Sequence, residues 1–205
     1  MADYQLEISF SDEQLDTLFT TKSNVIVAKP TGGSSTNVAW QVFQPFENNS
    51  VTWSEEYGIY VSNTKISNGA TLTQMSSTSG NAQMDTTYTM QPSAIITGPA
   101  DGGTDDAFTL VNKYANLPYL TVGLYQNAVV NGVLVKGNAI SAVPTLYQST
   151  AVMTPFTTVY LWLQSEVSSN TVVSVVTSPM TQLTFGGGVN EISVSYDSAT
   201  GTFIS

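Results

Sequence analysis

Short segments in which apolar and polar side chains alternate recur along most of this chain. Residues 4–10, YQLEISF, are the clearest example, because every second side chain is apolar or aromatic. That two-residue period is typical of a strand with one buried face. From residue 24 onward similar segments follow one another, each bounded by Gly, Pro or Asn, as in all-β domains.

The alternation predicts a single antiparallel β-sandwich domain over residues 1–205, because many short strands at regular spacing favour this architecture. A chain of 205 residues is long enough to bury a core without disulfides. The predicted strands after residue 24 are 25–29, 38–44, 51–54, 57–62, 70–75, 86–91, 107–112, 119–130, 133–136, 146–153, 158–164, 172–177, 181–185, 191–196 and 202–204.

Two local signals are more specific. Ser11 followed three residues later by Gln14 is a capping-box pattern, and it predicts one short amphipathic helix over residues 12–20. Asn131 and Gly132, between two valine-rich segments, tolerate the positive φ angles of a type I′ turn, so they predict a hairpin.

A weak internal similarity raises the possibility of two related halves, residues 1–97 and 105–205. VFQPF at 42–46 resembles VMTPF at 152–156, and each precedes a segment that carries a tryptophan. Convergent strand composition explains the same similarity.

The charge of the chain excludes several partners. Its net charge is −10, and its five cations are all lysines. Nucleic acids and anionic membranes are bound through Lys/Arg clusters, so neither is an expected partner. Without arginine the chain also lacks the bidentate group that recognises carboxylates and phosphates.

The chain contains neither cysteine nor histidine. It therefore has no thiolate nucleophile, lacks the commonest general base, and has none of the ligands that zinc and copper sites favour. GxSxG, SxxK and phosphate-binding glycine motifs are also missing from the sequence. We therefore expect a non-enzymatic protein without a resident cofactor.

The N-terminal residues MADYQLEISF do not read as a signal peptide, and no apolar run reaches the length of a membrane span. The expectation is a chain that is cytoplasmic as synthesised, with release, if any, by a signal-independent route.

The segment SVTWSEEYGIYVS at 50–62 holds the candidate binding residues Trp53, Glu55, Tyr57 and Tyr60. Aromatic rings stack on the apolar faces of sugars and polar side chains reach the hydroxyl groups, so the segment suits a neutral glycan. Because neighbouring strand residues point to opposite faces, Glu55 and the adjacent Glu56 do not form a glycosidase pair. Trp40 and Trp162 lie in apolar alternation and are expected in the core, which leaves Trp53, Tyr57 and Tyr60 as the more exposed rings.

A glycine-rich acidic segment, GPADGGTDDAF at 98–108, contains Asp101, Asp105 and Asp106. Carboxylates in a flexible loop suit calcium, although the spacing is not that of an EF-hand. A solvated acidic turn without a metal is the alternative.

Three functions remain open from the sequence. The first is lectin-like recognition of neutral glycans by a homo-oligomer, in which weak sites gain avidity. The second is a water-soluble precursor of a pore-forming toxin, because residues 171–185 resemble a barrel hairpin in their Ser/Thr-rich alternation. The third is a self-assembling structural or storage protein, favoured by the low charged fraction of 10%.

Overall fold

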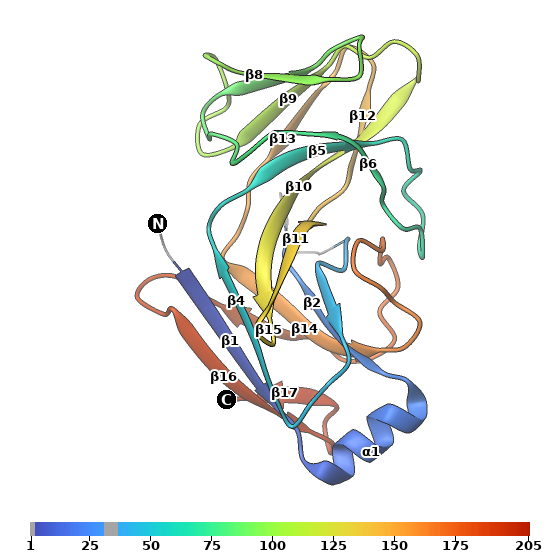
Figure 1. Cartoon of the computed structure of the whole chain (residues 1–205), viewed down its shortest axis with the longest axis vertical. Coiled ribbons are helices and arrows are strands. Elements are labelled where there is room, and N and C mark those ends of the chain that lie inside the picture. The colour runs from blue at the N-terminus through green and yellow to red at the C-terminus, as the bar shows by residue number, and fades with distance from the viewer. Residues whose placement is uncertain (1–2, 31–36) are drawn as a thin grey trace.

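The structure, a computed structural model, describes residues 3–30 and 37–205. It confirms an all-β, sandwich-like fold with one short helix in the described part of the chain. In Figure 1, β8 and β9 lie at one end of the molecule and the helix lies at the other.

The strands form three sheets. The largest has nine strands: β17 (Thr202–Ile204), β16 (Glu191–Asp197), β1 (Asp3–Ser9), β4 (Asn48–Ser54), β10 (Tyr119–Val130), β5 (Gly58–Ser62) and β6 (Gln74–Ser77) in spatial order, with β11 (Val133–Ala139) and β12 (Val143–Leu146) also paired to β10. A four-stranded sheet has the order β15 (Thr181–Thr184), β14 (Thr158–Gln164), β2 (Asn24–Ala28) and β3 (Gln41–Phe43). The other four-stranded sheet has the order β13 (Thr150–Met153), β9 (Phe108–Asn112), β7 (Thr87–Met90) and β8 (Ile96–Ala100).

Most strand pairs are antiparallel, as predicted, but two are parallel. β1 pairs with β16 in parallel, and so does β7 with β9. β1 and β16 come from opposite ends of the chain, and the antiparallel pair of β2 and β14 also joins distant segments. Strands from residues 1–97 and 105–205 therefore share sheets, and whether the two halves are related in sequence stays a prediction.

All three sheets contribute to one hydrophobic core. The inward-facing residues follow the two-residue period, for example Leu6 and Ile8 on β1 and Ile59 and Val61 on β5. Trp40 and Trp162 are fully buried, which confirms their expected place in the interior. In β1 and β4 the alternation in the sequence thus corresponds directly to the buried face, whereas β5 is buried on both faces.

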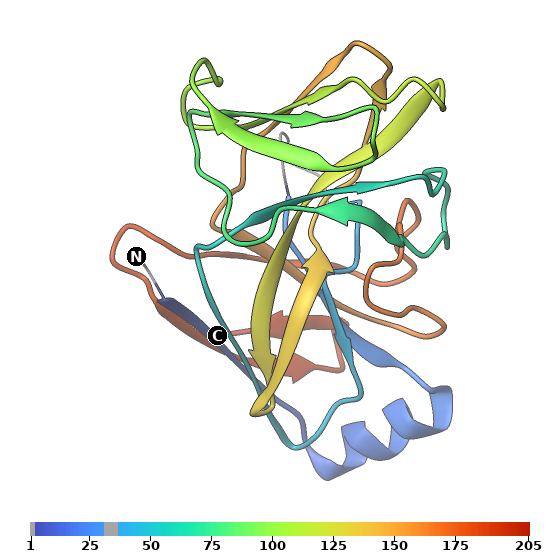
Figure 2. The ribbon, with the colours of Figure 1, turned by 45° about the horizontal axis from the view of Figure 1, so that its top comes forward.

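The helix and the hairpin are where the local signals predict them. Helix α1 spans Asp12–Thr21, and its capping box is formed: the Gln14 amide donates to the Ser11 hydroxyl, and the Ser11 amide donates to the Gln14 side chain. Asn131 and Gly132 have φ angles of 49° and 80°, and they join β10 to β11 in a hairpin that crosses the middle of the molecule in Figures 1 and 2.

Several strand predictions are wrong in part. The predicted strand 70–75 contains a bridge at Thr71 and the first two residues of β6, and the predicted strand 38–44 contains a bridge at Val38 and then β3. Residues 172–177 contain an isolated bridge at Val172 rather than a strand. The predicted strand 146–153 contains only the last residue of β12, then a turn in which Gln148 has a positive φ of 64°, and then β13. Strand β8 lies in the Gly/Pro-rich segment where no strand is predicted, and it pairs with β7.

Candidate functional site

Three strands each place one polar side chain on their core-facing side, and the three side chains meet. Lys29 follows the end of β2, Glu55 follows the end of β4, and Gln126 lies within β10. Each of these residues lies at an inward-facing position in the two-residue period of its strand. The core residues that share these faces are Val25, Val27, Val51, Trp53, Leu124 and Ala128.

The Lys29 ammonium is completely buried and makes three polar contacts. Its Nζ lies 3.1 Å from Glu55 Oε1, 3.1 Å from Gln126 Oε1 and 3.2 Å from the Tyr57 hydroxyl oxygen. A lysine ammonium has three N–H donors, so these contacts satisfy all of them. Burial of this charge is therefore compensated by an ion pair and two hydrogen bonds.

Aromatic rings enclose the same ammonium. Nζ lies 5.6 Å from the ring centre of Trp40, 5.4 Å from that of Trp53 and 5.3 Å from that of Tyr57. All three distances are within the range of cation–π attraction, which is stronger at desolvated sites than at exposed ones. We call Lys29, Glu55, Tyr57, Gln126 and the two tryptophans the lysine cage.

Glu55 is the partly exposed member of the lysine cage. Its side chain is 21% exposed, whereas that of Lys29 is 0% exposed. The carboxylate accepts hydrogen bonds from Trp53 Nε1 at 3.3 Å, from Lys29 and from the Tyr57 hydroxyl. These donors fix its orientation toward the buried amine.

Burial changes the acid–base chemistry of this cluster. Desolvation lowers the pKa of Lys29 to about 8, although the Glu55 charge and hydrogen bond act in the opposite direction. The pKa of Tyr57 is raised, first by burial and then by the Glu55 charge. A fraction of Lys29 is therefore neutral and nucleophilic near physiological pH, while Tyr57 stays protonated.

The tyrosines give a pH prediction. Burial raises the pKa of Tyr60 as well as that of Tyr57, so in both the folded-state pKa lies above the unfolded value. Their contribution to stability is complete below a pH of about 10 and is lost above it, at about 1.4 kcal/mol per pH unit for each group. A phenolate absorbance titration should show both ionising only when the protein unfolds. Ionisation of all ten tyrosines in the native state would contradict this.

A hollow opens on the surface beside the lysine cage, where β4 and β10 diverge. The two strands pair at Thr52–Val129 and Val51–Val130, and elsewhere along its length β10 pairs with β5. The hollow has a volume of about 220 Å³. We call it the β4–β10 hollow; it is lined by Asp3, Tyr4, Thr52, Trp53, Ser54, Glu56, Asn127, Ala128, Val129 and Leu134.

A second hollow of about 300 Å³ lies on the other side of the same turn. It is lined by Glu55, Glu56, Tyr57, Asn81, Ala82, Met84, Phe108 and Pro155. Glu56 lines both hollows, so the turn that carries the two glutamates separates them.

The expected exposure of the binding rings is wrong. Trp53 and Tyr57 are each 4% exposed and Tyr60 is 0% exposed. The alternation continues through this segment, so Trp53 and Tyr57 point into the main core, where both contact the Lys29 ammonium, and Tyr60 points to the opposite face of its strand. Trp53 lines the β4–β10 hollow, while Glu55 and Tyr57 line the second one.

Tyr60 lies on the opposite face of β5 from the residues that enter the main core. It belongs to a separate small core and donates a hydrogen bond to the Ser141 carbonyl at 2.5 Å. Gly123 makes room for it, because a Cβ there would lie 2.5 Å from the Tyr60 ring and 2.0 Å from the Ser141 carbonyl oxygen. Tyr60 is therefore part of the interior and not of either hollow.

The acidic loop does not form a metal cluster. Asp101 follows β8, whereas Asp105 and Asp106 lie in the turn before β9, and all three are exposed. In the part of the chain that the structure describes, which includes all three, no group of three or more His, Cys, Asp or Glu side chains is arranged to hold a metal ion. The Asp106 amide instead donates to the carboxylate of Asp85.

Sequence reasoning missed Lys29 and Gln126. The sequence contained a signal for both. Each is a polar residue at an inward-facing position, two residues away from apolar residues that lie on the same face of the strand. It also missed Asn127 and Asp3, whose exposed side chains line the β4–β10 hollow but carry no sequence motif.

The Ser/Thr-rich segment 171–185 is only partly a strand in the structure. One strand, β15, is formed there, and residues 173–180 have no regular structure. No helix within residues 3–30 and 37–205 has the length and apolar character needed to cross a membrane.

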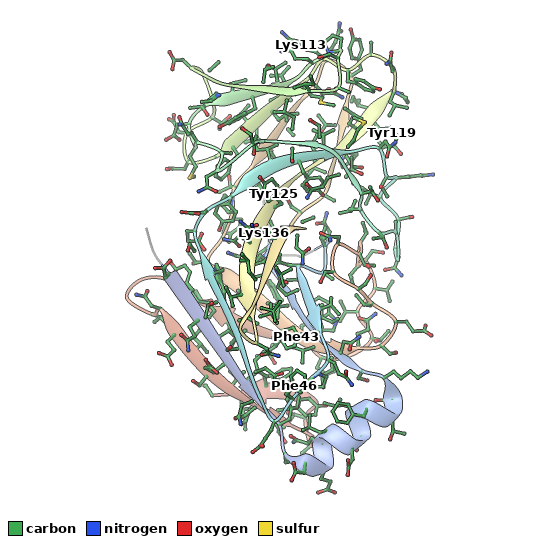
Figure 3. All side chains as sticks on the ribbon, viewed as in Figure 1. Phe43, Phe46, Lys113, Tyr119, Tyr125 and Lys136 are labelled. Atoms are coloured by element: carbon green, nitrogen blue, oxygen red, sulfur yellow. The ribbon has the colours of Figure 1, made fainter. Side chains whose placement is uncertain are left out.

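Two labelled lysines, Lys113 and Lys136, lie far apart, one near the β8–β9 end and the other on β11 (Figure 3).

Comparison with known proteins identifies no relative: no family model, curated protein or solved structure matches this chain.

Proposed function

We propose that this protein is a non-enzymatic, lectin-like binding protein that recognises neutral glycans at the β4–β10 hollow. The observation that carries the proposal is the composition of that hollow, which combines two carboxylates, an amide and hydroxyl groups with an apolar wall. None of its lining residues is a lysine. Such a lining favours a neutral ligand with many hydroxyl groups over an anion.

The polar side chains of the hollow have hydrogen-bonding capacity suited to sugars. Asp3 accepts a hydrogen bond from the Ser54 hydroxyl at 2.7 Å, which orders its carboxylate. The Asn127 side-chain oxygen accepts from the Gly137 amide at 2.8 Å, which fixes the amide plane and leaves its NH₂ group as a donor for a ligand. Glu56 adds a second carboxylate.

The apolar side of the hollow suits the C–H face of a sugar ring. Leu134, on the hairpin, is 55% exposed, and Val129 lies opposite it in the β10–β11 ladder. A volume of about 220 Å³ is below the ~300–1,000 Å³ of drug-sized sites. The expected ligand is therefore a single terminal sugar unit.

A site of this size binds one sugar weakly, so the proposal includes a symmetric homo-oligomer that presents several sites at once. Linked sites gain avidity of about 10²–10⁴ without new contacts. Light scattering of the purified protein measures its oligomeric state. A monomer at working concentration would contradict this part of the proposal.

Glycan binding is the direct test. The protein is expected to bind one or more members of an array of neutral glycans, and Glu56→Gln or Asn127→Ala should weaken that binding about tenfold each, the effect of one lost hydrogen bond of ~1.4 kcal/mol. Titration calorimetry with the best glycan measures the change. Both lining side chains are partly or fully exposed, so these variants are expected to fold.

Glu47→Gln is the matched control, because Glu47 is an exposed glutamate outside the lining of this hollow. It removes the same charge and should leave the affinity unchanged. The proposal fails if the folded protein binds no neutral glycan, or if Glu56→Gln and Asn127→Ala bind the glycan as tightly as Glu47→Gln does.

A further inference from the structure

We propose that Lys29 and Gln126 form an intramolecular isopeptide bond, with Glu55 as the catalytic residue that transfers the proton. This inference does not depend on glycan binding. It arises from the lysine cage, where an amine, a carboxamide and a carboxylate meet in a buried site.

The nucleophile is in place. Lys29 Nζ lies 3.1 Å from Gln126 Oε1, so the amine lies beside the side-chain carbonyl group, whose carbon is one bond beyond that oxygen. Groups held next to each other in one orientation gain a large advantage over the same groups free in solution. The Lys29 ammonium is completely buried, which favours the neutral amine that attack requires.

The electrophile and its leaving group are also held. Gln126 is 1% exposed, and its Nε2 donates to the Ser54 carbonyl at 2.7 Å. That contact fixes which side-chain atom is oxygen and which is nitrogen, and the oxygen is the one that faces Lys29. The nitrogen therefore lies away from the attacking amine, on the side from which ammonia departs.

Glu55 accepts and returns the proton. Its Oε1 touches Lys29 Nζ at 3.1 Å, and its Oε2 accepts from the Tyr57 hydroxyl. That hydroxyl also lies 3.2 Å from Lys29 Nζ, so it adjoins both the carboxylate and the amine and can relay a proton between Glu55 and the reacting nitrogen atoms. Tyr57 remains protonated before and after the step.

The reaction balances without any co-reactant. The Lys29 ammonium gives a proton to Glu55, and the neutral amine forms a bond to the Gln126 side-chain carbonyl carbon. The bond from that carbon to Nε2 breaks as the proton of Glu55 and the second amine proton pass to the departing nitrogen. The nitrogen leaves as ammonium, which carries the positive charge of the original Lys29 ammonium, and Glu55 is again a carboxylate.

The rival acyl donor is Glu55 itself, which is as close to Nζ as Gln126 is. A carboxylate paired with an ammonium is a poor electrophile, because attack places further negative charge on it in a site of low dielectric. The neutral carboxamide does not carry that penalty. The two products differ in mass, because amide formation with Glu55 releases water and with Gln126 releases ammonia.

The bond would join two sheets. Lys29 follows β2 of the β15–β14–β2–β3 sheet, and Gln126 lies on β10 at the centre of the nine-stranded sheet. A covalent link across the sandwich restricts the unfolded chain in the way that a disulfide does in other proteins. This chain has no cysteine with which to form one.

Intact-mass spectrometry of the full-length purified protein is the test. Its mass is expected to be lower than the sequence mass by one ammonia molecule. Digestion at lysine should yield one species that contains residues 23–65 joined to residues 114–136, because Lys22, Lys65, Lys113 and Lys136 flank the two partners. The Lys29→Met, Gln126→Met and Glu55→Gln variants should each have their full sequence mass.

Gln41→Met is the matched control. Gln41 is a buried glutamine, 1% exposed, whose Nε2 has no hydrogen-bond partner among the described residues, and it faces Asn138 rather than Lys29. This variant should still lose one ammonia. The wild-type measurement decides the matter even if a core variant fails to fold.

Three results would overturn the inference. The first is the full sequence mass in a folded wild-type protein after prolonged incubation, and the second is loss of water instead of ammonia. The third is loss of ammonia without the joined peptides, which would indicate cyclisation elsewhere, for example at Asn131–Gly132.

Discussion

Replacing Trp40 with alanine is expected to lower the free energy of unfolding by about 3–5 kcal/mol, the usual cost of deleting a buried tryptophan. Trp40 is fully buried, and its indole N–H donates to the Gln126 backbone carbonyl at 3.1 Å. Its ring packs edge-on against Trp53, with centroids 5.6 Å apart, and faces the Lys29 ammonium. The substitution therefore removes core volume, a hydrogen bond and one wall of the lysine cage. Chemical denaturation measures the loss.

Trp40→Phe separates these contributions. Phenylalanine keeps an aromatic ring but loses the N–H donor and part of the volume, so the expected loss is smaller than that of alanine. Trp162→Phe is the matched control, because Trp162 is equally buried but lies in a different core cluster and donates to the Gln164 side chain. If Trp40→Ala unfolds at the same denaturant concentration as the wild type, Trp40 does not stabilise the core through these contacts.

Local features of the fold were predictable because they depend on neighbouring residues. The two-residue period predicts the buried faces of β1 and β4, and the capping box predicts the start of α1. The Asn131–Gly132 turn was predictable because it requires positive φ at two consecutive residues.

Features that depend on distant parts of the chain were not predictable. The parallel pairing of β1 with β16 joins residues nearly the whole chain length apart, and no local pattern encodes it. Residues 172–177 have strand-like composition, yet Val172 forms a bridge to Val38 and the segment continues without a strand partner among the described residues. Strand propensity describes what fits a sheet, and tertiary context decides whether a partner is available.

In the candidate site, too, the features set by neighbouring residues were predictable and those set by distant parts of the chain were not. The two-residue period of the neighbouring strand residues predicts that Lys29, Glu55 and Gln126 each point into the core. Their meeting cannot be read from the sequence, because it depends on how β2, β4 and β10 are placed in two sheets. The aromatic residues near Glu55 were expected at the surface because of their chemistry. Their positions in the two-residue period of the strands place them in the interior instead.

Replacing Glu55 with glutamine is expected to lower the free energy of unfolding by about 3 kcal/mol relative to wild-type protein in which Lys29 and Gln126 are not joined, near the lower end of the cost of breaking a buried ion pair. The neutral side chain would leave the Lys29 ammonium, which is 0% exposed, without a counter-charge. The lower end applies because Glu55 is 21% exposed and water reaches its side of the pair. Glu56→Gln is the matched control, since Glu56 belongs to the same turn but is not part of the lysine cage, and it should change stability by less than about 0.5 kcal/mol.

The double variant Lys29→Met/Glu55→Gln identifies the cause of that loss. It removes the buried charge along with its partner, and methionine is close in length to the apolar stem of lysine, so most of the stability lost in Glu55→Gln should return. Neither variant can form the proposed Lys29–Gln126 bond, because one lacks the catalytic carboxylate and the other lacks the amine as well. The difference in the free energy of unfolding between the two variants therefore measures the cost of the unpaired charge alone. If the double variant is no more stable than Glu55→Gln, the cost arises from lost hydrogen bonds to Trp53 and Tyr57, and the lysine cage is held together by its neutral groups.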